Sequence, residues 1–382
     1  MKEPDCDEPI PFASSEGLGR HTGMMLTSPT ALVTASPVVQ VTGRLAGIGT
    51  ALPSDRVSSE DIWQALRALR GGHLPRAAQP GQNHHRHLAA PVEWILQPHT
   101  QSDRTDAYLR HARGLAYTAA AEAIRRAGTR ASDIGLIISV SCTGFVLPSL
   151  ETELIPRLGL GEDTTRLPIT ELGCGGGVAA LGRAYDYLRA YPDRAVLVVA
   201  VELPSLTFQP EDRSIDNLVA ALVFGDGAGA ALLDASAGSG WHVTRTGSVL
   251  IPEGARHLGY ELRDGGLRVI LSRQLPDVIE LHLRRAVDRF LAEDGLAIGD
   301  IDQVVAHPGG PRVLDAVAGS LGLATHRLES SEQVFAEVGN VSSATIFFVL
   351  DALAIPSGPA TALAIAFGPG LSIELAILRF QP

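Results

Sequence analysis

Three residues of this chain are of the types that acyl transfer through a thiol requires. Cys174 stands among four glycines, His307 precedes a Pro-Gly-Gly turn, and Asn340 follows a glycine. A thiol at the start of a helix ionises more readily, because the helix dipole and the free backbone N–H groups favour the thiolate. An imidazole and a carboxamide supply the base and the oxyanion donor that this nucleophile needs. The pattern predicts a cysteine acyl-transfer enzyme whose fold brings these distant residues together.

Each of these residues also has a simpler interpretation. Cys174 could be an inert buried thiol, and Asn340 could be a helix N-cap. His307 is one of twelve histidines, and only its place before a glycine turn distinguishes it. The glycines at 175–177 loosely fit a dinucleotide-binding fingerprint, but residues 166–170 before them make a poor strand. The glycines around Cys174, and its match with Asn340 described below, favour catalysis.

Composition limits the function and the location of the protein. The chain has 382 residues, is 45% hydrophobic and carries a net charge of −11, which disfavours nucleic acid as a partner. Its N-terminus is acidic and no apolar run is long enough for a membrane span. Three cysteines, Cys6, Cys142 and Cys174, suggest no disulfide framework, so we expect a cytoplasmic protein. The histidine cluster at 84–87 lacks neighbouring ligands, so we interpret it as a solvated loop and expect no metal site.

The chain repeats a set of landmarks in the same order. Residues 131–134 match 298–301, Gly173-Cys174 matches Gly339-Asn340, and Phe224-Gly225-Asp226-Gly227 matches Phe367-Gly368-Pro369-Gly370. These matches indicate a duplication, although short glycine-containing motifs also recur by chance. The two halves would then place Cys174 and Asn340 near a pseudo-twofold axis.

Apolar runs and helical periodicity predict an α/β protein of two similar halves, 39–237 and 238–382. Continuous apolar runs are typical of strands buried on both faces. Helices buried between two sheets would join the halves. Residues 1–38 lack periodicity and read as a flexible extension, and residues 71–102 read as a long loop or lid. The expected strands are 137–141, 195–201 and 361–366, and the expected helices are 115–127, 175–188, 281–291 and 342–354.

Taken together, the motifs resemble the type III polyketide synthases, the chalcone synthase-like branch of the thiolase fold. The resemblance runs from about Val41 to Phe380. It implies a five-layered αβαβα fold built from two duplicated halves, a homodimer, and no tightly bound cofactor, with acyl-CoA and malonyl-CoA as substrates. The motifs that carry it are residues 141–149, 172–177, 208–212, 222–227, 305–310, 339–344 and 367–370.

The resemblance also assigns roles to residues. It makes Cys174 the acyl acceptor, His307 its ion-pair partner and base, and Asn340 an amide donor to an enolate. Phe224 matches a gatekeeper aromatic, and Val269 stands where plant members carry a second aromatic, which we expect to widen the passage. Leu147 matches the residue that reaches into the partner subunit's pocket. The other matching cavity positions are Cys142, Thr143, Thr207 and Ser342.

The cations that bind CoA do not align securely. Because CoA thioesters are anionic, they require a local basic patch on an acidic protein. The candidates are Arg67, Arg70, Arg76, Arg86 and Arg312, together with Gly309 and Gly310.

We therefore predict a bacterial enzyme that extends an acyl-CoA, fatty in its acyl part, with malonyl-CoA to a pyrone or resorcinol. The stretch 258–266 resembles that of alkylpyrone and alkylresorcinol synthases. Two alternatives stay open at this point. One is a ketoacyl synthase that performs a single condensation on a carrier protein, and the other is a non-catalytic thiolase-fold scaffold.

Overall fold

The computed structural model describes residues 42–72, 74 and 84–382, and these described residues form one compact unit. The expected flexible extension, residues 1–38, lies outside the described residues, as do Cys6 and Arg76. No helix among the described residues is both long enough and apolar enough to cross a membrane.

A single mixed sheet connects the two halves. In the described part of the chain its nine strands run in the order β11-β12-β13-β8-β1-β7-β6-β4-β5. The halves meet where Gly43 and Arg44 of β1 pair with Val243 and His242 of β8. The strands are β1 (Gly43–Ala51), β4 (Ile134–Val140), β5 (Thr165–Ile169), β6 (Ala195–Glu202), β7 (Gly227–Asp234), β8 (Gly240–Leu250), β11 (Gln303–Ala306), β12 (Ala360–Gly368) and β13 (Ser372–Gln381).

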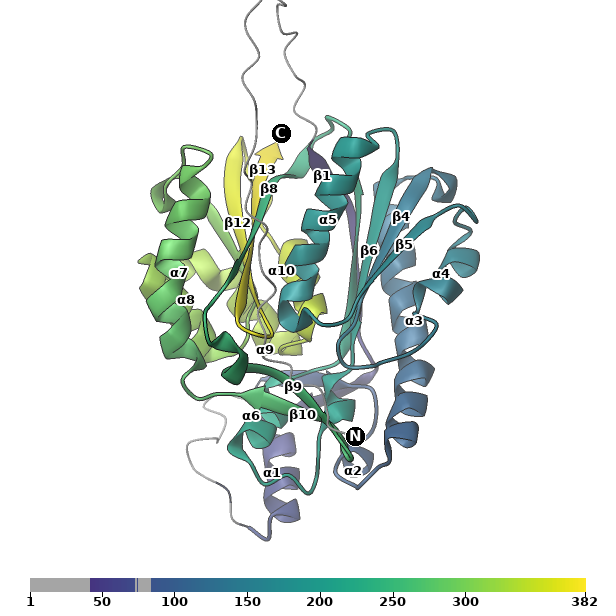
Figure 1. The fold of residues 1–382 in the computed structure, drawn as a ribbon, viewed down its shortest axis with the longest axis vertical. Helices are drawn as coiled ribbons and strands as arrows, with labels where there is room; N and C mark the ends of the chain where they lie inside the picture. The colour runs from purple at the N-terminus through teal and green to yellow at the C-terminus, as the bar shows by residue number, and fades with distance from the viewer. Residues whose placement is uncertain (1–41, 73, 75–83) are drawn as a thin grey trace, which may run out of the picture. The chain divides into compact units, whose positions relative to one another are not determined.

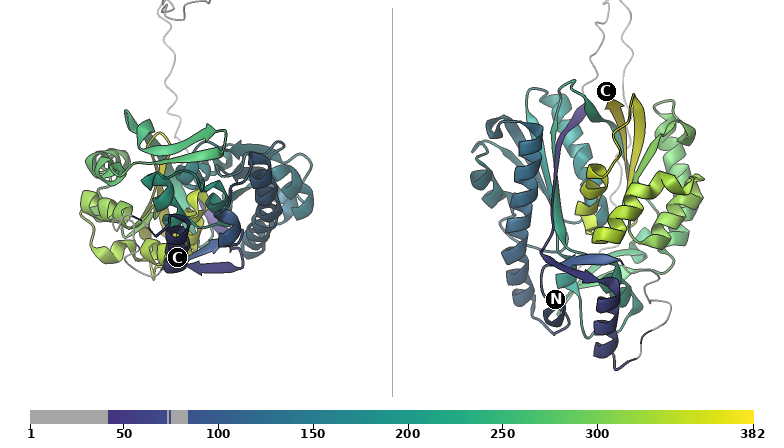
Figure 2. Two further views of the ribbon diagram at one scale, coloured as in Figure 1. Left: turned by 90° about the horizontal axis from the view of Figure 1, so that it is seen from below. Right: turned by 180° about the vertical axis from the view of Figure 1, so that it is seen from behind.

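The helices complete five layers (Figure 1). α5 (Gly176–Ala190) and α10 (Thr345–Asp351) lie between the two parts of the sheet. α3 (Gln101–Ala127) and α4 (Glu151–Leu158) cover one outer face, and the view from behind in Figure 2 shows the opposite face covered by α7 (Leu275–Ala292) and α8 (Pro311–Leu321). The predicted layered α/β fold is confirmed.

The strands form where the sequence is continuously apolar. Every residue of β4 and of β6 is buried, which fits strands covered by helices on both faces. One core cluster lies between these strands, α5, α10 and the C-terminal strands β12 and β13. Two further clusters fill the outer layers of the N-terminal and C-terminal halves.

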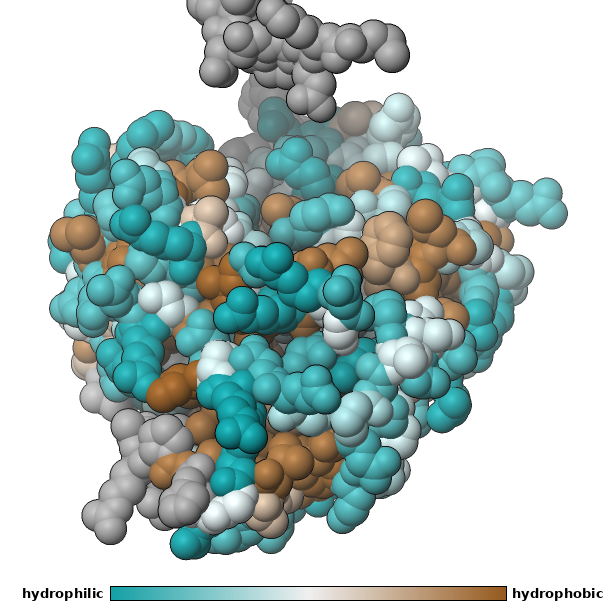
Figure 3. All heavy atoms as spheres, turned by 60° about the horizontal axis from the view of Figure 1, so that its bottom comes forward, coloured by the Kyte–Doolittle hydropathy of each residue, from teal (hydrophilic) through white to brown (hydrophobic). Residues whose placement is uncertain are grey.

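Several short elements gather at the lower end of the layers in Figure 1. Figure 3 turns this end toward the viewer, and hydrophobic side chains show between hydrophilic ones across it. The elements are α1 (Ser59–Leu69), β2 (Asp55–Ser58), β3 (His85–Leu88), α2 (Val92–Ile95), α6 (Ile215–Val223), β9 (Leu258–Arg263), β10 (Gly266–Leu271) and α9 (Glu329–Val338), with the 3-10 turns η3 (Gly173–Gly175), η4 (Pro204–Thr207) and η8 (Ser342–Ala344).

Two sequence-based expectations about local structure are wrong. The segment 71–102 is not simply a loop, because β3 pairs with β2 and Val92–Ile95 form a helix. The histidine cluster therefore includes a strand, and no group of three or more His, Cys, Asp or Glu side chains in the described ranges is arranged to hold a metal ion. Residues 165–169 do form a strand, β5, which pairs only with β4. Pro168 is tolerated there because an edge strand leaves one row of N–H groups unpaired.

Candidate active site

Cys174 lies in the turn η3, directly before α5 and between the two halves. The glycines that follow it allow the halves to approach closely. A Cβ atom on Gly177 would lie 2.4 Å from the carbonyl oxygen of Ser343 and 2.6 Å from Cγ2 of Ile346. These glycines therefore serve packing between the halves, which argues against the dinucleotide interpretation.

Asn340 is held in place through both its backbone and its side chain. Its N–H donates to the carbonyl of Val223 at 3.0 Å, and its own carbonyl accepts from the N–H of Gly225 at 3.0 Å. Its Oδ1 accepts the N–H of Ser342 at 2.8 Å, so the NH2 of the amide is left as a donor. Sγ of Cys174 lies 3.9 Å from Oδ1. The structure thus brings Cys174 and Asn340 into one site.

His307 follows β11 and is 1% exposed. Its N–H donates to the carbonyl of Ile365, at 2.7 Å. Neither ring nitrogen has a hydrogen-bond partner among the described residues. β11 packs against α9 and α10, the helices on either side of Asn340 along the chain. A buried imidazole with two unsatisfied nitrogens is free to exchange a proton with a reacting group.

The electrostatics of the site keep both reactive groups neutral. Burial raises the pKa of the Cys174 thiol to about 11, against a smaller lowering by the hydrogen bond to Ser342. Burial also lowers the pKa of His307 to about 3. Desolvation therefore opposes the thiolate that the helix start favours, because burial disfavours the charged form of a thiol.

Glu202 is a site residue that sequence reasoning missed. It ends β6, is fully buried, and accepts hydrogen bonds from Ser343 Oγ at 2.5 Å, Thr143 Oγ1 at 2.7 Å and the Cys142 N–H at 3.1 Å. Burial raises its pKa, against lowering by those donors. The sequence did mark Glu202, because it ends a strand that is otherwise wholly apolar. A carboxylate buried at such a place requires hydrogen-bond donors around it.

Ser342 stands between two thiols. Its Oγ lies 3.6 Å from Sγ of Cys174 and 3.5 Å from Sγ of Cys142, and its backbone has a φ of +47°. The pocket residues Cys142, Thr143 and Ser342 therefore lie around Cys174 and Glu202. Burial raises the pKa of Cys142 well above its usual range, so this second thiol also stays protonated.

Tyr260 lies in β9, within the stretch 258–266 that the sequence analysis noted. Burial raises the pKa of its phenol well above the usual range, and the charges of Cys142 and Cys174 raise it further. A hydrogen bond with Thr207, a cavity residue, acts in the opposite direction. The phenol therefore stays neutral.

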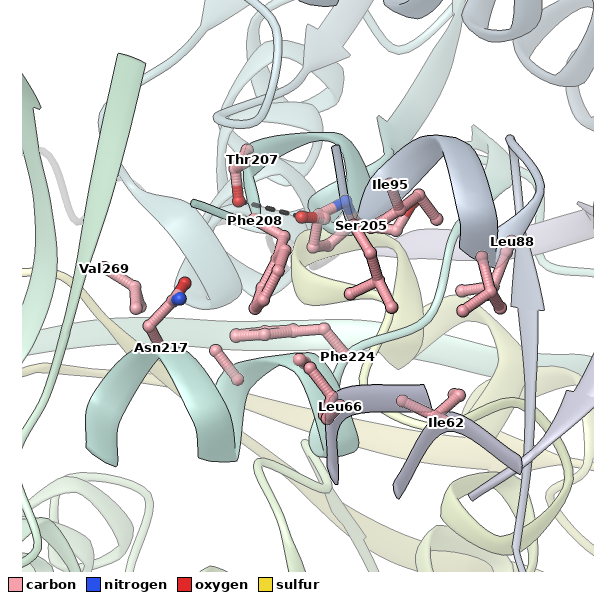
Figure 4. Close-up of a pocket in the computed structure, with 15 residues that line it drawn as sticks. Ile62, Leu66, Leu88, Ile95, Ser205, Thr207, Phe208, Asn217, Phe224 and Val269 are labelled. Atoms are coloured by element: carbon pink, nitrogen blue, oxygen red, sulfur yellow. Dashed lines mark hydrogen bonds between the residues drawn. The ribbon is translucent and has the colours of Figure 1, made fainter. Parts of the chain in front are cut away.

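Phe224 lines an apolar cavity (Figure 4). The backbone of Phe224 forms a β-bridge with Asn340, so the cavity adjoins the segment that carries the amide. Thr207 and Val269, two of the predicted pocket residues, also line it. The other lining residues are Ile62, Leu66, Leu88, Val92, Ile95, Leu96, Pro204, Ser205, Phe208, Asn217, Ala220 and Ala221.

The remaining predicted residues make none of the contacts with Cys174 described above. Leu147 is 83% exposed. Arg67 is exposed in the last turn of α1, and Arg70 donates to the carbonyl of Asp212 at 2.5 Å, just before α6. Arg312 is exposed in the first turn of α8.

Gly310 caps the start of α8 with a φ of +146°, and Gly309 precedes it. A Cβ atom on Gly310 would lie 3.9 Å from Val223, at the end of α6. The glycine turn thus approaches the C-terminal end of α6, whereas Arg70 contacts the segment before its N-terminus.

Arg86 cannot bind a CoA phosphate from its position. It is 2% exposed and donates to backbone carbonyls of the protein, including those of Leu222 and Phe335. The expectation that it contributes to a basic surface patch is wrong, because its guanidinium points into the protein.

Comparison with protein-family models gives two matches that together span most of the chain. The model for the N-terminal domain of chalcone and stilbene synthases matches residues 96–237, and the model for their C-terminal domain matches residues 243–382.

Similar proteins and structures agree with these matches. A 1,3,6,8-tetrahydroxynaphthalene synthase of Streptomyces peucetius subsp. caesius is 36% identical, with 93% of this chain and 98% of that protein aligned. The alpha-pyrone synthesis polyketide synthase-like Pks18 of Mycobacterium tuberculosis is 29% identical, over 93% and 94% of the two chains. The crystal structure of 1,3,6,8-tetrahydroxynaphthalene synthase from Streptomyces coelicolor A3(2), a bacterial type III polyketide synthase, superimposes with a TM-score of 0.83 at 32% identity, over 90% of this chain and 99% of that one.

Proposed function

The chain belongs to the chalcone and stilbene synthase family and is a type III polyketide synthase, and we propose that a fatty acyl-CoA is its starter. It is an acyltransferase that condenses malonyl-CoA repeatedly and closes the chain to a ring. The observation that carries the choice of starter is the apolar cavity that Phe224 lines, which offers side chains from α1 and α6 to an alkyl chain. The alternatives of a single-condensation ketoacyl synthase and of a scaffold find no support among the relatives.

In this proposal Cys174 is the nucleophile that loads the starter and His307 is its base. The neutral imidazole takes the thiol proton while Sγ attacks the thioester carbonyl, and CoA leaves as its thiol. This yields an acyl-enzyme on Cys174. Burial of the site excludes the water that would hydrolyse it.

Extension requires a stabilised enolate. Malonyl-CoA loses CO2, and the negative charge moves onto the thioester oxygen of the remaining acetyl unit. The NH2 of Asn340, held by the contact of Oδ1 with Ser342, and the imidazole of His307 are the donors we assign to that oxygen. Donors of this kind contribute roughly 3–4 kcal/mol each to transition-state stabilisation. The enolate carbon then attacks the acyl-enzyme and lengthens the chain by two carbons.

We place CoA entry between α1, α6 and the start of α8. Arg67 and Arg70 stand at the end of α1, Arg312 lies in the first turn of α8, and Gly309 and Gly310 let a phosphate approach the N–H groups there. Cations at these places compensate for the net charge of −11. We also propose a homodimer in which exposed Leu147 reaches into the partner subunit, and a cytoplasmic enzyme.

The starter assignment is tested by incubating the enzyme with malonyl-CoA and a panel of short, long and aromatic acyl-CoAs, followed by mass spectrometry of the products. We expect the most efficient synthesis of pyrones or resorcinols from long alkyl starters. Product from malonyl-CoA alone, with no incorporation of long starters, would refute the fatty starter while leaving the family activity intact. A parallel reaction with carrier-protein substrates should yield nothing.

A further inference from the structure

Arg86 carries a buried guanidinium that pairs with no carboxylate among the described residues. Its Nε donates to the carbonyl of Leu222 at 3.1 Å, and its Nη1 donates to the carbonyl of Phe335 at 3.2 Å. The guanidinium carbon lies 4.7 Å from the centre of the Phe335 ring. A buried positive charge is costly unless hydrogen bonds and aromatic contacts replace its hydration. The contacts with Leu222 and Phe335 provide this replacement and fix the position of the guanidinium.

The two carbonyls belong to the last turns of two helices, α6 and α9. Carbonyl groups in a last helical turn carry partial negative charge. The Phe335 carbonyl also accepts the N–H of Gly339 at 3.0 Å, so Arg86 is its second donor. Arg86 therefore binds the C-terminal turns of two helices at once. Burial lowers its pKa to about 10, so it remains a cation at neutral pH.

The same two helices lead directly into the active site. Phe224 follows α6 and Asn340 follows α9, and their backbones are joined by the hydrogen bonds between Asn340 and its neighbours Val223 and Gly225. The link between the helix ends and the site is therefore only one or two residues long.

The glycine before Asn340 makes room for the arginine. Gly339 has a φ of +79°, and a Cβ atom there would lie 2.4 Å from Cδ and 2.5 Å from Nε of Arg86. The side chain of Arg86 therefore packs directly against Gly339, the residue before the amide donor Asn340.

We propose that Arg86 is a positioning residue that sets the spacing between the gate, Phe224, and the amide donor, Asn340. The inference rests on the proposed function in one respect, the assignment of Asn340 to the enolate oxygen. A two-pronged guanidinium can hold both helix ends at a fixed separation, whereas the single ammonium of lysine cannot reproduce that geometry.

The test compares Arg86→Lys and Arg86→Met with the unmodified enzyme. Decarboxylation of malonyl-CoA should fall by about tenfold to a hundredfold in kcat, with KM little changed, because small misplacements of a catalytic group have effects of this size. Alkylation of Cys174 by iodoacetamide, which needs no oxyanion donor, should keep its rate. Hydrogen exchange measured by mass spectrometry should quicken in the peptides that contain the Gly225 and Asn340 amides.

Arg44→Met is the matched control. Arg44 pairs with Asp234 at the end of β7 that is remote from Phe224, so its loss should cost stability without changing decarboxylation or those exchange rates. If Arg86→Met does not fold, decarboxylation and hydrogen exchange of Arg86→Lys alone test the proposal. Unchanged decarboxylation and exchange in Arg86→Lys would overturn the proposal. If the unmodified enzyme failed to decarboxylate malonyl-CoA, the proposed function would fall, whereas the exchange experiment would still test the contact of Arg86 with the two helices.

Discussion

Val269 lies directly opposite Tyr260 in the antiparallel pair of β10 and β9. Opposite residues of such a pair direct their side chains to the same face. Tyr260 therefore supplies an aromatic ring on the same face of the hairpin as Val269, which lines the apolar cavity.

Replacing Val269 with phenylalanine should shift the enzyme toward short starters. Val269 is 9% exposed and lines the apolar cavity, so a larger ring must take space from an alkyl chain. Overpacking costs about 1–3 kcal/mol, and kcat/KM for long acyl-CoA should fall about tenfold relative to short acyl-CoA in competition assays. Leu262→Phe, at a 74% exposed position of β9, is the control. Undiminished use of long starters would contradict the assignment of the cavity.

Alanine at Asn340 should slow both decarboxylation and condensation. Removal of one oxyanion donor lowers kcat by about a hundredfold to a thousandfold. Release of CO2 from labelled malonyl-CoA measures the first step, and product analysis measures the second. Gln333→Ala, on the exposed face of α9, should leave both rates unchanged. An Asn340→Ala enzyme with normal decarboxylation would remove the amide from the mechanism.

Alanine at Cys174 should abolish product while leaving some decarboxylation of malonyl-CoA, because the donors to the enolate remain. Mass spectrometry of the intact protein after incubation with acyl-CoA should detect an acyl group on the natural enzyme and none on this variant. Cys6→Ala serves as the control and should acylate normally. Acylation of the Cys174→Ala variant would mean that another side chain is the acceptor.

The reactivity of Cys174 should depend on pH without a plateau in the neutral range. Because the pKa of the thiol is raised to about 11, it keeps its proton through pH 9, and the thiolate fraction grows about tenfold per unit of pH. His307, with a pKa near 3, stays neutral over the same range. Iodoacetamide labelling followed at the peptide level should rise steadily from pH 7 to pH 9, with glutathione in the same tube as reference. A constant rate from pH 6 upward would indicate an ion pair instead.

Two glycines give a stability test with opposite signs. Gly177→Ala would place Cβ 2.4 Å from the Ser343 carbonyl oxygen, so the melting temperature should fall by an amount equivalent to about 1–3 kcal/mol. Gly114→Ala, at an exposed position of α3 with open space around it, should stabilise the protein by about 0.5–1 kcal/mol. Calorimetry of the two variants distinguishes them. Equal melting temperatures would mean that the backbone around Gly177 accommodates the added methyl group without loss of stability.

The layered fold and the pairing of Cys174 with Asn340 could be predicted because both leave strong local signals. Apolar runs mark strands buried on two faces, and matching glycine turns mark related halves. The strand β5 gave a weak signal, since an edge strand buries little and accommodates Pro168. Its short polar sequence resembles a loop.

The missed parts of the site depend on distant contacts. Tyr260 shares a face with Val269 only through the register of a hairpin, and Arg86 acquires its contacts only from helices far along the chain. The ionisation of Cys174 also depends on the assembled fold. A helix start favours the thiolate, whereas the depth of burial, which opposes it, is a property of the assembled halves.

The close fit of Gly177 against Ser343 limits how such enzymes can be recombined. The nucleophile turn of one half and the amide-bearing turn of the other touch without space for a methyl group. A chimera that joined the first half of this chain to the second half of a relative would need both turns to match in shape, whatever the conservation of the reactive residues. Laboratory recombination should therefore succeed only when these two turns are exchanged as a unit.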